Sequence, residues 1–338
     1  WGTHFDRTQT WWKPGRALFE YWKRCQALLQ WGRIAEKKEN DFTVNTEDSL
    51  RVKYIHRHQE AINIYFVANT SRKPGLAHCS FSVKGMQPEL WDPVTAQIRQ
   101  LTQFEFKNGV TSFDIQFDKA QSFFIVFRKK STVQLHARPN FPLLKTITEI
   151  DGAWKVQFDS LWGGPPRPLL MKKLQDWTTS EIKGVKYFSG TAVYTNHFRL
   201  TAAQHTQIKT NCYLDLGNVK HIASIQLNGK DLGVVWTAPW RIAIPAGWLQ
   251  LNNYLKIEVT NVWANRLIGD EQEPADCEWL PAHLDNGKFL KEFPDWFLKN
   301  EQRPSAGRYC FTTWNYFSKD YKLVSAGLLG PVQLMVEQ

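Results

Sequence analysis

The sequence predicts a mainly β protein: two β-sandwich domains with one helix before them. Three observations lead to this prediction. Apolar residues recur at helical spacing near the start of the chain, they alternate with a period of two from Arg51 onward, and two Asn-Gly dipeptides join apolar runs as in tight hairpins. With 338 residues, 43% hydrophobic and 22% charged, the chain is long enough for two globular domains and has an ordinary globular composition.

A helix is predicted over residues 14–32. Pro14 suits its first position, where the missing N–H is no loss, and Gly32 is a typical stop signal. The apolar residues between them recur at helical spacing: Leu18, Phe19, Trp22, Cys25 and Leu29. The polar stretch from Glu36 to Ser49 is predicted to be a connection.

A first β-sandwich is predicted over residues 50–132. Ile62–Ala68 is apolar enough for a largely buried strand, and Ser122–Phe127 indicates another. Asn108-Gly109 indicates a tight turn, because both residue types tolerate positive φ angles. The turn joins two alternating runs, Phe104 and Phe106 before it and Phe113, Ile115 and Phe117 after it. A proline-bearing linker, residues 133–144, is predicted to follow.

A second β domain is predicted over residues 145–338. Asn228-Gly229 indicates another hairpin, between a strand that ends at Leu227 and the apolar run Leu232–Trp236. Leu255, Ile257 and Val259 alternate with charged residues, as in a half-buried strand. Tryptophan in a β-sandwich favours core filling over a ligand platform, and four recur here: Trp236, Trp240, Trp248 and Trp263.

Composition excludes several classes of protein. No run of about 18 apolar residues exists, so no membrane span is predicted. The net charge of +10 is concentrated in residues 51–144, where 13 basic residues outnumber 6 acidic ones. These charges are scattered rather than clustered, so we predict no nucleic-acid partner. The five cysteines are spaced singly, which indicates neither a zinc site nor a dense disulfide scaffold.

The first twelve residues place a histidine, an aspartate, an arginine and three tryptophans just before the predicted helix. Sugars present apolar C–H faces and a fringe of hydroxyls, so a sugar site combines aromatic platforms with charged hydrogen-bonding groups. This pattern indicates a sugar pocket. The alternative is a loop whose tryptophans only anchor the helix.

A second candidate is the acidic stretch Asp270–Glu278, which holds five carboxylates and no basic residue. Calcium takes six to eight oxygen ligands, so the stretch could hold this ion, and a solvated acidic loop is the alternative.

No catalytic centre is indicated by the sequence. Glycoside hydrolysis usually needs two carboxylates, and only Asp6 is well placed. A Gly-x-Ser-x-Gly elbow and a phosphate-binding loop are absent from the sequence.

Longer motifs follow one another along nearly the whole chain. The first is Gly2–Trp12 (GTHFDRTQTWW), followed by Tyr21, Arg24, Cys25 and Gln26. It resembles the end of the catalytic barrel in glycoside hydrolase family 106, the α-L-rhamnosidases. Three motifs resemble the β-sandwich after that barrel: Tyr54–Arg57, Ile64–Asn69 and Leu90–Pro93. Four resemble a sugar-binding jelly roll shared with family 2 β-glycosidases: Phe188–Tyr194, Leu227–Gly233, Thr260–Asp270 and Ser325–Pro331.

The resemblance implies a galactose-binding-like jelly roll over residues 145–338 and, over residues 1–45, the C-terminal remnant of a (β/α)8 barrel. It implies an inverting α-L-rhamnosidase-like hydrolase of plant or microbial polysaccharide, whose two catalytic glutamates lie upstream of residue 1. Since the first residue is Trp1 rather than Met, we expect a fragment that is inactive alone. We expect it to pack against the missing N-terminal barrel.

The resemblance implies substrate contacts in this chain and no catalytic residues. One group would border the sugar pocket of the intact enzyme: His4, Asp6, Arg7, Trp11 and Trp12. A second group lies in the jelly roll, where the same residues could instead order a long loop: Asn261, Trp263, Asn265, Arg266 and Asp270.

The resemblance further implies a rhamnose-containing glycan as partner, Ca²⁺ in the intact enzyme without identified metal ligands in this chain, and an extracytoplasmic parent protein. Two other functions stay open. One is a non-catalytic carbohydrate-binding module, and the other is an accessory domain of a family 2-like β-glycosidase.

Overall fold

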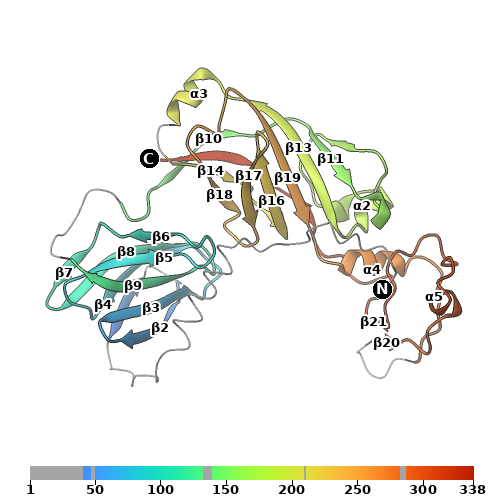
Figure 1. Ribbon diagram of the computed structural model, residues 1–338, viewed down its shortest axis with the longest axis horizontal. Helices are drawn as coiled ribbons and strands as arrows, with labels where there is room; N and C mark the ends of the chain where they lie inside the picture. The colour runs from blue at the N-terminus through green and yellow to red at the C-terminus, as the bar shows by residue number, and fades with distance from the viewer. Residues whose placement is uncertain (1–40, 47–49, 132–138, 209–210, 282–286) are drawn as a thin grey trace. The chain divides into compact units, whose positions relative to one another are not determined.

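The computed structural model describes residues 41–46, 50–131, 139–208, 211–281 and 287–338, which form two compact units. The first ends at Leu143 and the second comprises Leu144–Gln338. Both are built from antiparallel sheets, which confirms the predicted mainly β class (Figure 1). The predicted helix over residues 14–32 lies outside the described residues. None of the helices within the described ranges is long and apolar enough to cross a membrane.

The first unit contains two sheets. One has the order β1-β4-β8-β7 and consists of β1 (Phe42–Thr46), β4 (Gly75–Phe81), β8 (Val110–Phe117) and β7 (Glu105–Lys107). The other has the order β2-β3-β9-β5-β6 and consists of β2 (Val52–Gln59), β3 (Ile62–Asn69), β9 (Ser122–Lys130), β5 (Met86–Trp91) and β6 (Ile98–Gln100).

Aromatic rings from both sheets form the core of this unit. Phe81 of β4 lies 4.9 Å from Tyr65 of β3 and 5.5 Å from Phe127 of β9, measured between ring centroids. The predicted β7–β8 hairpin is confirmed, with φ angles of 54° at Asn108 and 84° at Gly109. These positive angles are the ones that a two-residue hairpin turn of this kind requires.

The prediction of a plain connection from Glu36 to Ser49 is wrong for residues 42–46, which form β1 and pair with β4. Phe42 explains the difference, because its side chain is buried and its ring lies 4.6 Å from Tyr54 and 5.1 Å from Phe81. One buried ring therefore holds an otherwise polar segment in the sheet.

Asp41, just before β1, links the two sheets of this unit. Its carboxylate accepts a hydrogen bond of 2.7 Å from the Tyr54 hydroxyl and lies 2.6 Å from Nδ1 of His56, both on β2. The His56 ring stacks on Tyr65 at 3.9 Å. Burial, together with the hydrogen bond to Asp41, raises the pKa of Tyr54 to about 12, so the hydroxyl stays a donor at neutral pH.

The second unit has a six-stranded sheet in the order β12-β11-β13-β19-β16-β17, with β12 (Leu169–Met171), β11 (Trp154–Phe158), β13 (Thr191–Arg199), β19 (Asn252–Thr260), β16 (Ile222–Leu227) and β17 (Lys230–Val235). A four-stranded sheet has the order β10-β23-β14-β18, with β10 (Leu144–Glu149), β23 (Gln333–Glu337), β14 (Cys212–Asp215) and β18 (Arg241–Ile244). Outside these two sheets, the second unit also contains short elements: β15 (Val219–Lys220) paired with β22 (Gly327–Leu328), η1 (Ser160–Trp162), η2 (Trp177–Thr179), α2 (Lys183–Lys186) and α3 (Ala202–Gln207).

Two tryptophans that the sequence did not single out lie in the core of this unit. Trp154 and Trp177 are buried, and the Trp177 indole N–H donates a 2.5 Å hydrogen bond to the Tyr194 hydroxyl. The alternation of Leu255, Ile257 and Val259 along β19 is confirmed, since all three are buried. The second Asn-Gly hairpin, between β16 and β17, is confirmed as well.

Core filling is the wrong interpretation for two of the four tryptophans singled out earlier. Trp236 and Trp263 are 50% and 75% exposed. Both lie just past the end of a strand, outside the alternation that turns side chains into the core. Trp240 and Trp248 are half-buried and pack against the core.

Residues 263–324 leave the sheets between β19 and β22 and are called the lobe below. The lobe contains α4 (Ala264–Asp270), β20 (Lys288–Phe289), α5 (Asp295–Leu298) and β21 (Trp314–Asn315), where the sequence indicated only long loops. Figure 1 shows these four elements grouped outside the six-stranded and four-stranded sheets. The lobe carries the second group of predicted site residues.

Candidate functional site

Asn261 and Ser189 hold the start of the lobe to the six-stranded sheet. The buried Asn261 amide accepts a hydrogen bond from the Gly190 N–H and donates one to the Phe188 carbonyl, both at 2.9 Å. The Ser189 hydroxyl donates to the Val262 carbonyl and accepts from the N–H of Arg266, again at 2.9 Å. The chain between β19 and α4 is therefore fixed by polar contacts with the segment that precedes β13.

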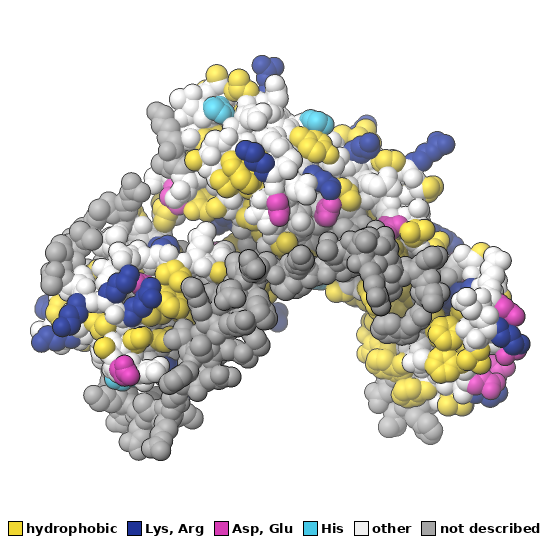
Figure 2. Space-filling view, in the orientation of Figure 1, with side chains coloured by type: hydrophobic (Ala, Val, Ile, Leu, Met, Phe, Trp, Pro, Cys, Tyr) yellow, Lys and Arg dark blue, Asp and Glu magenta, His cyan; other side chains and the backbone are white. Residues whose placement is uncertain are grey.

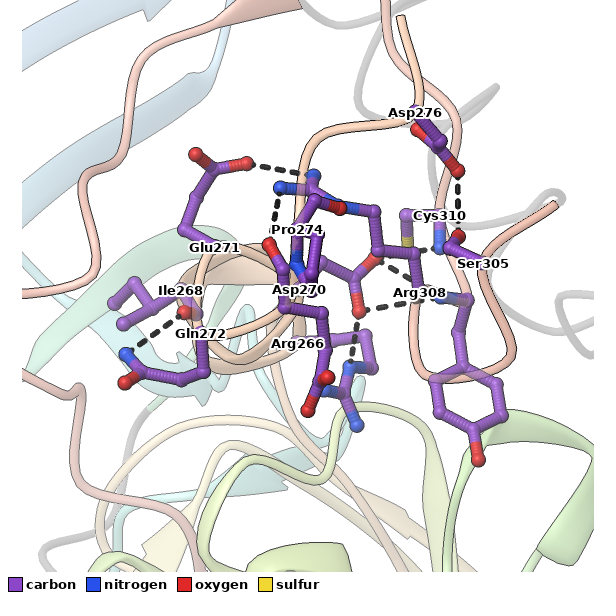
Figure 3. Close-up of polar contacts among 12 residues, drawn as sticks. Arg266, Ile268, Asp270, Glu271, Gln272, Pro274, Asp276, Ser305, Arg308 and Cys310 are labelled. Carbon is purple, nitrogen blue, oxygen red and sulfur yellow. Dashed lines mark hydrogen bonds and ion pairs between the residues drawn. The ribbon is translucent and has the colours of Figure 1, made fainter.

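Asp270, the last residue of α4, is the centre of a buried polar network (Figure 3). One carboxylate oxygen accepts a 2.9 Å hydrogen bond from Nε of Arg266, one turn earlier on the helix. The other accepts from the backbone N–H groups of Tyr309 at 3.1 Å and Cys310 at 2.7 Å. The side chains of Arg266 and Asp270 are 7% and 4% exposed. This network ties α4 to a segment about 40 residues later.

The acidic stretch that follows is neutralised by basic residues from outside it. Arg308 pairs with Glu271 at 2.9 Å, Arg303 with Asp276, and Lys291 with Glu278 at 2.7 Å. The stretch is therefore not without basic partners, since folding brings the cations in from positions 291–308, and it stays solvated in part, as the 71% exposed side chain of Glu278 shows.

Asp276 shows how strong this neutralisation is. Burial alone would raise its pKa, but hydrogen bonds from Arg303 and Ser305 outweigh burial and hold the pKa of the carboxyl below its ordinary value. The Ser305 hydroxyl donates to Asp276 at 2.6 Å, a hydrogen bond that Figure 3 marks.

Calcium does not fit the acidic stretch. Four of its five carboxylates pair with a cation, whereas a calcium site needs carboxylates that turn several oxygens toward one point. Across the described residues, no cluster of three or more His, Cys, Asp or Glu side chains is suited to a metal ion.

Of the two other predicted site residues in the lobe, one has a buried side chain and one an exposed side chain. Asn265 is fully buried, and its amide binds both the N–H and the carbonyl of Val324, at 2.8 and 2.7 Å. Trp263 is 75% exposed. Asn261, Asn265, Arg266 and Asp270 thus bind groups of the chain itself, and among the five only Trp263 presents its side chain to solvent. Their role as substrate contacts stays a prediction. The first group, His4 to Trp12, lies outside the described residues.

The lobe also carries a set of exposed aromatic rings that was not predicted from the sequence, called the aromatic strip below. Its members are 43–52% exposed: Phe289, Trp314, Tyr316 and Tyr321. Phe289 of β20 is paired with Trp314 of β21, and the ring centroids of Trp314 and Tyr316 are 5.3 Å apart. The density of aromatic residues over 289–321 could have indicated it, but these residues follow neither a helical nor a strand period.

The comparisons with known proteins agree with the resemblance read from the motifs. A family model described as alpha-L-rhamnosidase matches residues 34–106. The structure of a rhamnosidase from Novosphingobium sp. PP1Y superposes with a TM-score of 0.71 and 28% identity, over 94% of this chain and 26% of that chain. A curated protein of Formosa agariphila, whose name describes it as a candidate beta-glucuronidase, is 40% identical over 187 residues, 55% of this chain and 15% of its own length.

The chain therefore spans about a quarter of the solved rhamnosidase and less of the curated relative. In family profile and in fold, it resembles glycoside hydrolase family 106, the α-L-rhamnosidases.

Proposed function

We propose that this chain is the C-terminal, non-catalytic part of an α-L-rhamnosidase-like glycoside hydrolase that acts on plant or microbial polysaccharide. The observation that carries the proposal is the similarity to the Novosphingobium rhamnosidase over 94% of the chain. A match over this much of the chain includes both units, so the similarity to the rhamnosidase is not that of one common β-sandwich alone.

The state of the buried carboxylates supports a non-catalytic role. A glycosidase needs a carboxyl group that can donate or accept a proton at the glycosidic bond. In the described ranges, the most buried carboxylates of both units are held in ion pairs or hydrogen bonds: Asp41, Glu89, Asp270 and Asp276. The same bonds keep the pKa of Glu89 and of Asp276 low, which is unsuitable for a general acid.

In this proposal the acid and base lie in the rest of the protein, and the two units brace the barrel that carries them. Because the acidic stretch does not fit calcium, the Ca²⁺ of the intact enzyme would bind outside it. A polysaccharide is too large to enter a cell, so the parent protein would act outside the cytoplasm.

A chimaera tests the proposal. The matching region of the Novosphingobium rhamnosidase is replaced by this chain, and hydrolysis of an aryl α-L-rhamnoside is measured. The same enzyme with that region deleted is the control. We expect the chimaera to hydrolyse the rhamnoside and the deletion variant to be inactive. A folded chimaera as inactive as the deletion variant would contradict the proposal, and so would turnover by the isolated chain.

The curated relative supports a second candidate, an accessory part of a β-glycosidase. To test it, the matching region of the Formosa agariphila protein is replaced by this chain, and hydrolysis of an aryl β-glucuronide is measured against the same protein with that region deleted. Activity restored there, with no activity in the rhamnosidase chimaera, would favour the second candidate.

A further inference from the structure

We infer that the aromatic strip of the lobe is a non-catalytic binding surface for a rhamnose-containing saccharide chain. The inference rests on the proposed function for the identity of the sugar. The rings, the contacts that fix them and the polar groups beside them define the site.

The rings of the strip are arranged as a connected surface. The centroids of Tyr316 and Tyr321 are 5.9 Å apart, and Phe317 lies 5.2 Å from Tyr316 and 5.1 Å from Tyr321, edge-on to both. With Trp314 next to Tyr316, ring contacts run from Trp314 to Tyr321, and Phe289 joins them through the pairing of β20 with β21. Figure 2 shows hydrophobic side chains gathered on the lobe.

The backbone under the strip is fixed by contacts within the second unit. The Gln272 side chain, just after α4, donates a 2.7 Å hydrogen bond to the Lys319 carbonyl, and Asn265 binds Val324. Gly287 lets β20 approach β21, because a Cβ there would lie 2.4 Å from the Asn315 carbonyl oxygen. Rings held in place before a ligand arrives lose little conformational entropy on binding.

The chemistry of the strip fits a sugar better than an apolar protein surface. Three of its four members, Trp314, Tyr316 and Tyr321, carry an N–H or O–H group on an apolar ring, which suits a ligand with both C–H faces and hydroxyls. The Tyr316 and Tyr321 side chains hydrogen-bond to each other, which holds these two rings together. Rhamnose carries a methyl group beside its C–H face, which adds apolar surface for contact with an aromatic ring. Exposed lysines stand next to the rings in the chain, at positions 288, 319 and 322, and can donate hydrogen bonds to hydroxyl or carboxylate oxygens.

The test measures binding of rhamnogalacturonan oligosaccharide to the 338-residue chain by calorimetry. Trp314→Ala is compared with Trp236→Ala, which removes a tryptophan of almost equal exposure, 48% against 50%, elsewhere in the same unit. We expect Trp314→Ala to weaken binding about tenfold, the loss of one stacking contact, and Trp236→Ala to leave it unchanged. Tyr321→Ala is the second variant should Trp314→Ala fail to fold, as judged by circular dichroism.

Three results would overturn the inference. The first is no binding by the unsubstituted chain, and the second is equal weakening by both tryptophan variants. The third is unchanged glycan binding by Trp314→Ala together with a loss of activity when the same change is made in the chimaera, which would identify the strip as a docking surface for the rest of the protein. None of these bears on the proposed function, which the rhamnosidase activity of the unsubstituted chimaera decides.

Discussion

Replacing Asp270 with Asn should loosen the lobe. The carboxylate accepts from Arg266 on one oxygen and from the Tyr309 and Cys310 N–H groups on the other. An amide of the same shape has one acceptor and one donor. Whichever way it is turned, its NH2 group must therefore face an N–H donor, and Arg266 keeps a buried positive charge without its partner.

The expected size follows from burial. Breaking a buried ion pair by removing one partner costs about 3–5 kcal/mol, and both side chains here are less than 10% exposed. Asp295→Asn is the matched control, because Asp295 also pairs with a cation four residues away in the lobe, Lys299, but its side chain is 77% exposed. Exposed pairs of this kind contribute about 0.5 kcal/mol or less.

Urea unfolding followed by tryptophan fluorescence measures the difference in stability. Hydrogen exchange at the Tyr309 and Cys310 amides shows whether the lobe opens before the sheets unfold. We expect faster exchange at these amides in Asp270→Asn and wild-type exchange in Asp295→Asn. Equal stability losses in the two variants, or wild-type behaviour of Asp270→Asn, would refute the reasoning from burial.

Three further predictions concern other parts of the structure. Tyr194→Phe should destabilise the second unit by about 1–3 kcal/mol in urea unfolding, because the buried Trp177 N–H loses its acceptor. Since hydrogen bonds lower the pKa of Asp276 in the folded protein, its stabilising contribution should be present above about pH 4 and be lost as the pH falls through the pKa of the folded state. Asp276→Asn should therefore make the loss of unfolding free energy with falling acidic pH less steep, as measured by urea unfolding. A pH dependence equal to that of the wild type would contradict this prediction. Iodoacetamide at pH 8 should label the thiols of Cys79, Cys212 and Cys310 only after unfolding, because burial raises their pKa to about 11 or 12. Cys79 and Cys212 are buried and Cys310 is half-buried. Mass spectrometry of the peptides locates the label, and labelling of the folded protein at these positions would contradict the prediction.

The features that the sequence predicts well are local. Both Asn-Gly hairpins are confirmed because the turn chemistry is contained in two adjacent residues. The alternation along β19 succeeds for the same reason, since the period of a strand directs neighbouring side chains to opposite faces. The strand Phe42–Thr46 was missed because one buried ring is too little to show a period.

The features that the sequence does not reveal depend on residues far apart in the chain. The acidic stretch looks solvated until Arg303 and Arg308 fold back onto it, some 30 residues later. Tryptophan alone does not show whether a side chain lies in the core, as Trp177 does, or is exposed beyond a strand end, as Trp236 is. The predicted contacts of the first twelve residues remain predictions.

The way the lobe is closed at its base has an evolutionary consequence. Asn265 binds Val324, so the first and last turns of a 62-residue excursion are joined to each other, close to where the chain re-enters the sheets at β22. In the described part of the lobe, no residue between these two positions pairs with a strand of the six-stranded or the four-stranded sheet. An insertion, a deletion or an exchanged segment there should therefore change the surface of the lobe and leave the pairing of the strands in the two sheets as it is, which is the kind of change that evolution tolerates.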